Sequence, residues 1–147
     1  MQRIFHTPEG VRDIYSQECS RKQKLQEKLH SVFHQYGFED IETPTFEYFE
    51  VFSKEVGTIP SRDLYKFFDR EGNTLVLRPD FTPSVSRACA TYFNPEKEVV
   101  SLCYTGNTFI NNSSFRGRLK ETTQMGVERM GDDSPEADAE ILAMTVE

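Results

Sequence analysis

The chain has 147 residues, a length that suits one domain with its own hydrophobic core. Of these residues 37% are hydrophobic, 12% aromatic and 28% charged, and no apolar run approaches the roughly 20 residues of a membrane-spanning helix, which excludes a membrane role. The formal net charge of −7 argues against a general nucleic-acid-binding protein, because phosphate contacts need clustered Lys and Arg.

The first ten residues, MQRIFHTPEG, lack the basic segment followed by an apolar one that marks a secretory signal. The three cysteines are Cys19, Cys89 and Cys103. Their odd number and the absence of CxxC spacing favour reduced thiols over a disulfide framework or a zinc site. The missing signal and the reduced thiols together predict a cytoplasmic protein. His6, His30 and His34 show no ligand spacing with the cysteines, so we assign them no role and expect no metal site.

The first half of the chain predicts a long helix, a short strand and a second helix. Residues 16–36 contain no Gly or Pro, and Gly37 suits the left-handed conformation that ends a helix. One apolar stripe runs along this helix: Leu25, Leu29, Val32, Phe33 and Tyr36. FEDIETP predicts a short strand closed by Pro44. EYFEVFSKEV, residues 47–56, predicts a helix with Phe49, Phe52 and Val56 on its core side.

The second half of the chain is richer in strands. LYKFFDREGNTLVLRP predicts a hairpin, because Gly72 and Asn73 accept positive φ in its turn. DFTPSVSRACATYF predicts a helix with Thr82 as N-cap and Pro83 at its first position. Strands follow in VVSLCYTG, NTFI and, after a loop through Gly117, in RLKETTQMGVERMG.

The last segment, SPEADAEILAMTVE, predicts a helix without a Gly or Pro stop signal. We therefore expect the N-terminal part of a longer protein. The alternative is a domain whose last helix simply ends there.

The order of these elements predicts the fold class. Strands outnumber βαβ crossovers, which predicts an α+β fold with an antiparallel sheet flanked by helices.

The last strand carries a polar face that could bind a ligand. Period-two alternation places Lys120, Thr122, Gln124, Gly126 and Glu128 on one face. A glycine inside a strand commonly marks the close approach of a ligand or another backbone. Gln124 and Glu128 lie about 13 Å apart at roughly 3.3 Å per residue, a span that suits a small polar molecule. The alternative is an ordinary solvated sheet face.

A second polar set follows the hairpin, in LRPDFTP. Asp80 and Thr82 could accept hydrogen bonds from an ammonium group, or they could cap the helix that follows. Tyr65 and Arg78 either line the same pocket or belong to the core or to a salt bridge. If both polar sets lie on one sheet, they form an amino-acid pocket.

The order of these signals resembles the catalytic core of the class II aminoacyl-tRNA synthetases, and within them the histidyl-tRNA synthetase family. TPEGVRDI is similar to the family's opening, YGFEDIETPTFE to its motif 1, LYKFFDREGNTLVLRPDFTP to its substrate-binding hairpin and GRLKETTQMGVERMG to the second strand of motif 2. The resemblance implies one class II domain over residues 1–147, with motifs 1 and 2 and without motif 3.

The resemblance also assigns residues to a histidine-type pocket. Asp80 and Thr82 match positions that hold the α-amino group of histidine, Gln124 and Glu128 match others that line the pocket, and Arg118 matches an arginine of the GRYR pattern.

The departures from the synthetase pattern concern its chemistry. Motif 2 normally begins with Phe-Arg, whose arginine contacts the ATP α-phosphate, but here Ile110 follows Phe109. The loss of one such contact typically costs about 100-fold to 1,000-fold in rate. Lys120 replaces a second arginine, NNSSF replaces a charged loop, and Asp80 is shorter than the expected glutamate. We therefore expect no catalytic residues and no cofactor.

With these departures, the sequence resembles the synthetase paralogues that serve as regulatory subunits of ATP phosphoribosyltransferase in histidine biosynthesis. That resemblance implies a short-form catalytic subunit as partner, L-histidine as effector, and a homodimer formed through the motif 1 region, Phe38 to Phe52. Two alternatives remain at this point: a divergent histidyl-tRNA synthetase that activates histidine and charges tRNA, and a synthetase-like scaffold or sensor with another partner.

Overall fold

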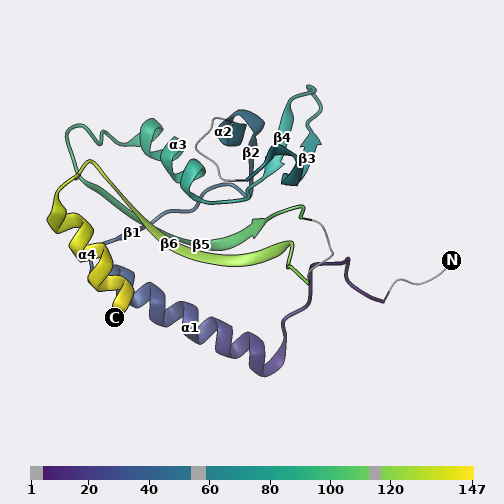
Figure 1. Cartoon of the computed structure of the whole chain (residues 1–147), viewed down its shortest axis with the longest axis horizontal. Helices are drawn as coiled ribbons and strands as arrows, with labels where there is room; N and C mark the ends of the chain where they lie inside the picture. Colours follow the sequence, from purple (N-terminus) through teal and green to yellow (C-terminus); the bar gives the residue numbers. More distant parts are fainter. Residues whose placement is uncertain (1–4, 54–58, 113–116) are drawn as a thin grey trace.

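The computed structural model describes residues 5–53, 59–112 and 117–147 (Figure 1). Its helices are α1 (Ser16–Gln35), α2 (Phe49–Ser53), the 3-10 turn η1 (Ser61–Asp63), α3 (Thr82–Tyr92) and α4 (Pro135–Val146). Its strands are β1 (Glu39–Asp40), β2 (Phe46–Tyr48), β3 (Lys66–Phe68), β4 (Thr74–Leu77), β5 (Val100–Phe109) and β6 (Glu121–Met130). The α+β class predicted from the sequence is confirmed. No helix in these ranges is long and apolar enough to cross a membrane.

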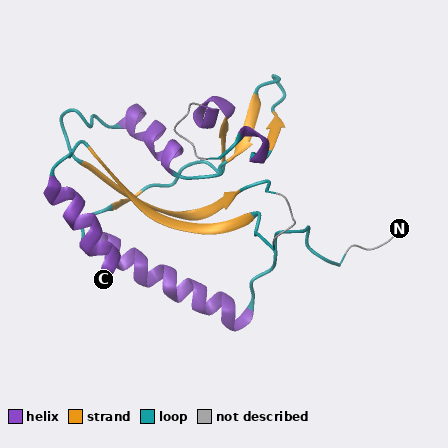
Figure 2. Cartoon of the chain, in the orientation of Figure 1, coloured by secondary structure: helices purple, strands orange, loops and turns teal. Residues whose placement is uncertain are grey.

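The strands form two small sheets (Figure 2). In the first, β5 and β6 pair antiparallel from Val100↔Met130 to Phe109↔Glu121, and β1 pairs parallel to β5 with Asp40 opposite Cys103. In the second, β4 lies between β2 and β3, and both pairings are antiparallel. The strands are therefore mostly antiparallel, as predicted, but the division into two sheets and the parallel β1 were not. Alternation along a strand fixes its two faces but does not identify its neighbours.

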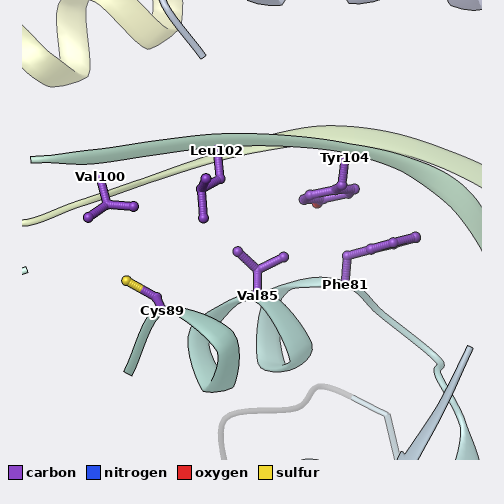
Figure 3. Packing of buried hydrophobic residues seen from close by; sticks show 6 residues of the cluster. All are labelled: Phe81, Val85, Cys89, Val100, Leu102 and Tyr104. Carbon is purple, nitrogen blue, oxygen red and sulfur yellow. The ribbon is translucent and has the colours of Figure 1, made fainter. Parts of the chain in front are cut away.

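Helices cover both faces of the β5–β6 hairpin, with α3 on one side and α1 and α4 on the other (Figure 1). On the α3 side, one cluster of buried side chains joins helix and strand: Phe81, Val85, Cys89, Val100, Leu102 and Tyr104 (Figure 3). On the opposite side, Cys103 packs with Phe38 and Met144. Successive residues of β5 thus serve opposite cores, as period-two alternation requires.

The predicted apolar stripe of α1 is only partly covered. Val32, Phe33 and Tyr36 pack against the cluster that contains Cys103, whereas Leu25 and Leu29 are 57% and 40% exposed. The C-terminal half of α1 therefore docks on the sheet more closely than the N-terminal half.

The segment predicted as a helix over residues 47–56 begins instead as a strand. β2 includes Tyr48, which pairs with Leu75 of β4, and α2 starts only at Phe49. Strand pairing with β4 outweighs the helical pattern there, since tertiary context overrides weak local propensity. Phe52 is buried with Phe49 packed against its cluster, as predicted, and Val56 lies outside the described residues.

The last predicted strand starts three residues later than expected, at Glu121. At Lys120 the pairing with β5 is only half made: its carbonyl still accepts from Ile110 N–H at 2.9 Å, but its own N–H donates to the carbonyl of Gly10 at 2.7 Å. The N-terminal segment therefore takes the hydrogen bond that would have extended the strand edge.

Candidate functional site

The four predicted pocket residues lie on one side of the β5–β6 hairpin, facing the start of α3. Leu102 and Tyr104 point toward α3, and their partners across the strands are Glu128 and Gly126. Gln124, two residues before Gly126, faces the same way. Asp80 and Thr82 stand at the end of the segment that leads from β4 into α3. The sequence alone left open whether the two polar sets meet; in the structure they do, although β4 and β6 belong to different sheets.

Two side-chain hydrogen bonds join the sets across this space. Thr82 Oγ1 donates to Glu128 Oε1 at 2.6 Å. Gln124 Nε2 donates to Asp80 Oδ1 at 3.4 Å, and the same carboxylate oxygen accepts from Phe81 N–H at 2.7 Å. Gln124 and Glu128 are half-buried, whereas Thr122 on the same face is exposed, so an ordinary solvated surface does not describe this end of the face.

The prediction that Thr82 caps α3 is wrong. Phe81 is the N-cap residue, no side chain bonds to the first free N–H groups, and the hydroxyl of Thr82 is directed to Glu128 instead. A charged acceptor makes a stronger hydrogen bond than a neutral one, which accounts for the choice of partner. Thr82 is therefore free of the capping role and belongs to the polar cluster.

Tyr104 is a member of this site that sequence reasoning missed. It lies directly opposite Gly126, where an added Cβ would overlap the Tyr104 hydroxyl oxygen. The ring of Phe81 stacks on the ring of Tyr104, with centroids 4.4 Å apart and planes within 8° (Figure 3). The glycine in β6 thus makes room for a side chain of the neighbouring strand, whereas we predicted a ligand or a backbone. A large aromatic residue across from a strand glycine is the signal that could have identified it, but that signal requires the register of β5 on β6.

The site carries two carboxylates among neutral partners. The hydrogen bonds of Asp80 and Glu128 come from an amide, a hydroxyl and a backbone N–H, and no ion pair to either residue is found in the described ranges. Burial raises the pKa of Tyr104 to about 12, and the charges of Glu128 and Asp80 add to this shift. This excess of negative charge in a half-buried space favours a cationic group such as an ammonium.

The raised pKa of Tyr104 predicts a pH-dependent stability. The folded protein holds this proton more tightly than the unfolded chain, so the contribution is complete below about pH 10 and is lost between about pH 10 and 12. We expect the free energy of unfolding to fall over this range by on the order of 2 kcal/mol more in the wild type than in Tyr104→Phe. Denaturant titrations at several pH values would measure the difference.

Tyr92→Phe is the matched control for this experiment, because Tyr92 is 76% exposed. The free energy of unfolding of Tyr92→Phe should vary with pH as that of the wild type does. The titrations of Lys and Cys occur in all three proteins and therefore cancel in the comparison. Parallel profiles for wild type and Tyr104→Phe would contradict the assigned cause.

Arg78 lies beside the site and belongs to the core rather than to a salt bridge. Its guanidinium is 4.1 Å from the centre of the Phe81 ring and donates to the carbonyls of Asn107, Thr43 and Pro44 at 2.8, 2.8 and 3.3 Å. An added Cβ at Gly106 would come 2.5 Å from its Nη2. Arg78 therefore fills the sheet face next to the polar cluster.

The family of the chain follows from its sequence similarity. The sequence model of the histidyl-tRNA synthetase family matches residues 10–147 of the chain. The chain belongs to the histidyl-tRNA synthetase family. Two relatives named ATP phosphoribosyltransferase regulatory subunit are 45% identical over 142 residues, from Ruminiclostridium cellulolyticum, and 42% identical over 143 residues, from Acetivibrio thermocellus. Each alignment covers 97% of this chain and 34% of the relative.

Solved structures show the same fold. The chain matches a Bacillus halodurans protein described as an ATP phosphoribosyltransferase regulatory subunit/histidyl-tRNA synthetase with a TM-score of 0.84 and 32% identity, over 99% of this chain and 38% of that one. It matches apo S. aureus histidyl-tRNA synthetase with a TM-score of 0.76 and 26% identity, over 97% and 33% of the two chains. The chain thus has the class II synthetase fold and spans about a third of the length of its curated relatives.

Within this synthetase-family fold, the motif 2 residues that depart from the pattern lie at the loop end of the β5–β6 hairpin, between Phe109 and Glu121. Ile110, at the position of the expected arginine, is half-buried and follows β5 directly. Arg118 is exposed before β6, and no hydrogen bond or ion pair of its side chain occurs among the described residues. Part of the NNSSF loop, residues 113–115, lies outside those residues. The structure therefore brings together Asp80, Thr82, Gln124 and Glu128 but not Arg118.

Proposed function

We propose that the protein acts as a non-catalytic regulatory subunit of ATP phosphoribosyltransferase, with a pocket for L-histidine formed by Asp80, Thr82, Gln124 and Glu128. The observation that carries the histidine pocket is the pair of carboxylates without a cationic partner among the described residues, which suits the ammonium of an amino acid. The names of the relatives support the assembly with a catalytic subunit.

The loss of synthetase chemistry rests on Ile110. An aliphatic side chain offers no hydrogen-bond donor to a phosphate or to the charge that develops during adenylation. Phe81 and Arg78 also occupy the sheet face beside the polar cluster. We infer a pocket that binds an amino acid without activating it.

Regulation follows from differential binding. Histidine shifts the complex toward the state that binds it more tightly, and the shift can be no larger than that difference in affinity. The proposed sequence of events is that the regulatory subunit activates a short-form catalytic subunit in the cytoplasm and that histidine reverses the activation.

We also propose a homodimer through the motif 1 region, Phe38 to Phe52. Supporting it, one face of the β2–β4–β3 sheet exposes aromatic side chains: Phe46 is 50% exposed, Tyr48 54% and Phe67 36%. Contiguous exposed apolar surface of this kind is typical of an interaction site.

The proposal is tested with the full-length gene product and a short-form catalytic subunit from the same source. The phosphoribosyltransferase rate is measured with and without the regulatory protein across a histidine titration. We expect activation that histidine reverses. An unchanged rate at every subunit ratio would contradict the proposal and favour a scaffold or sensor with another partner.

A divergent histidyl-tRNA synthetase is the second candidate, because the fold also matches the S. aureus synthetase. It requires another cation to replace the missing arginine at position 110. Histidine-dependent exchange of pyrophosphate into ATP by the full-length protein separates the two, since only a synthetase carries it out. We expect no exchange above background.

A further inference from the structure

Four side chains with metal-binding atoms converge on the side of the sheet opposite the histidine-type pocket. His30 and His34 come from α1, Asp40 from β1 and Cys103 from β5, and their ligand atoms all lie within 4.8 Å of one another. His30 and His34 are four residues apart and so share one helix face. Asp40 and Cys103 are partners in the parallel β1·β5 pairing. The fold therefore holds each pair in place by its own backbone hydrogen bonds.

The carboxylate of Asp40 is the centre of this cluster. His30 Nε2 lies 2.5 Å from Oδ1 and His34 Nε2 lies 3.0 Å from Oδ2, so the imidazoles contact one carboxylate oxygen each. Cys103 Sγ donates to Oδ1 at 3.4 Å. The two imidazole rings are adjacent, with centroids 4.2 Å apart.

We propose that His30, His34, Asp40 and Cys103 bind a divalent transition-metal ion of the zinc type. Two imidazole nitrogens, one thiolate and one carboxylate form a mixed nitrogen, sulfur and oxygen set that zinc accepts in tetrahedral geometry. A nitrogen- and sulfur-containing set disfavours Mg²⁺ and Ca²⁺, which require oxygen ligands.

The spacing of the ligand atoms fits such an ion. Bonds of about 2.0 to 2.3 Å in a tetrahedron place neighbouring ligand atoms about 3.3 to 3.8 Å apart. The present separations, from the 2.5 Å of His30 to Asp40 up to the 4.8 Å limit of the cluster, bracket this range. Movements of about one ångström, within the reach of side-chain rotation, would complete the geometry.

The exposure of the cluster provides an entry path. The side chains of His30, His34 and Asp40 are 37%, 45% and 55% exposed, whereas Cys103 is fully buried behind them. An ion arriving from solvent would meet the imidazoles first and the Cys103 thiol last, and the thiol would release its proton on binding. The competing explanation is a surface ion-pair cluster, which contributes little to stability. Such a cluster involves only the two histidines and Asp40 and gives no role to Cys103.

The sequence prediction of no metal site overlooked this cluster because two of its members are brought together by strand pairing alone. Asp40 and Cys103 are 63 residues apart, and β1 gave no signal of its parallel partner. The histidine spacing of four residues on a predicted helix was visible, but without the third and fourth ligands it is weak evidence.

The test uses the full-length protein, freed of metal with a chelator and titrated with Zn²⁺ by calorimetry and with Co²⁺ by absorption. We expect one equivalent of Zn²⁺ per chain and, for Co²⁺, a thiolate-to-metal charge-transfer band that Cys103→Ala abolishes. His30→Gln and His34→Gln should each weaken Zn²⁺ binding by about 100-fold or more, exceeding the 10- to 100-fold typical of groups that only support a ligand.

Two controls separate the site from other thiols and histidines. Cys89→Ala removes a buried thiol in the cluster on the other face, and His6→Gln removes an exposed histidine near the N-terminus; both should leave affinity and spectrum unchanged. Because Cys103→Ala alters a buried position, circular dichroism checks its fold, and the variants of the more exposed His30 and His34 test the site independently of that substitution. Zn²⁺ binding that is equal in wild type, His30→Gln and His34→Gln would overturn the proposal, as would the absence of stoichiometric binding.

Discussion

Replacing Arg78 with alanine is expected to lower the free energy of unfolding by about 3 kcal/mol or more. Arg78 is 7% exposed and its guanidinium donates to three backbone carbonyls that come from two separate regions, Thr43 and Pro44 before β2, and Asn107 in β5. Each buried acceptor left without its donor costs about 1 to 3 kcal/mol. The stacking of the cation on Phe81 is lost as well.

The position of Arg78 explains why so much depends on one side chain. It follows β4 of the β2–β4–β3 sheet and reaches across to β5 of the β1–β5–β6 sheet, so it joins the two sheets beside the start of α3. A lysine supplies one ammonium in place of a planar fork, so Arg78→Lys should recover only part of the loss.

Chemical denaturation of the full-length protein, followed by circular dichroism, measures the effect of Arg78→Ala. Arg70→Ala is the matched control, because Arg70 lies in the turn between β3 and β4, outside the core, and its loss should cost less than about 0.5 kcal/mol. If Arg78→Ala were no more destabilising than Arg70→Ala, the role of Arg78 in joining the two sheets would be wrong.

Features encoded over a few neighbouring residues were predictable from the sequence. The helix from Ser16 and the hairpin around Gly72 depend on local backbone preferences, and the structure contains both. Pro83 lies in the first turn of α3, but at its second position rather than the predicted first. The polar face of β6 was also predictable, because period-two alternation assigns Gln124 and Glu128 to one side without knowledge of the partner strand.

Features that depend on pairing between distant segments were not predictable in the same way. The parallel position of β1, the ring of Tyr104 over Gly126 and the convergence of Asp40 with Cys103 all require knowing which strands are neighbours. The hydroxyl of Thr82 shows the same limit at one residue: local pattern favoured a helix cap, whereas Glu128, 46 residues away, supplies a stronger acceptor.

The composition of the polar cluster is unfavourable for stability alone. Two carboxylates share a half-buried space beside Tyr104 and have only neutral hydrogen-bond partners among the described residues. Like charges in such a space repel one another, and a ligand that carries a positive charge relieves the repulsion. Sites built for binding commonly sacrifice stability in this way. The arrangement therefore makes opposite predictions for stability and for binding when one charge is removed.

Glu128→Gln tests this directly, and we expect it to weaken the binding of L-histidine by about 30-fold or more. That factor corresponds to the roughly 2 kcal/mol lower limit for removing one partner of a buried charged pair. The glutamine keeps the shape of the side chain and can still accept the hydrogen bond from Thr82, so the loss reports on charge. Calorimetric titration of the full-length protein with histidine gives the affinity.

Glu121→Gln is the matched control, since Glu121 lies on the same strand but on the opposite face, where it accepts from Asn107. Its histidine affinity should equal that of the wild type. Glu128→Gln should also unfold no more readily than the wild type, because it removes one of two neighbouring negative charges. Weaker binding in a protein of equal or greater stability cannot be attributed to loss of fold. An unchanged affinity would remove Glu128 from the pocket and leave Asp80 as the one carboxylate among the four proposed contacts.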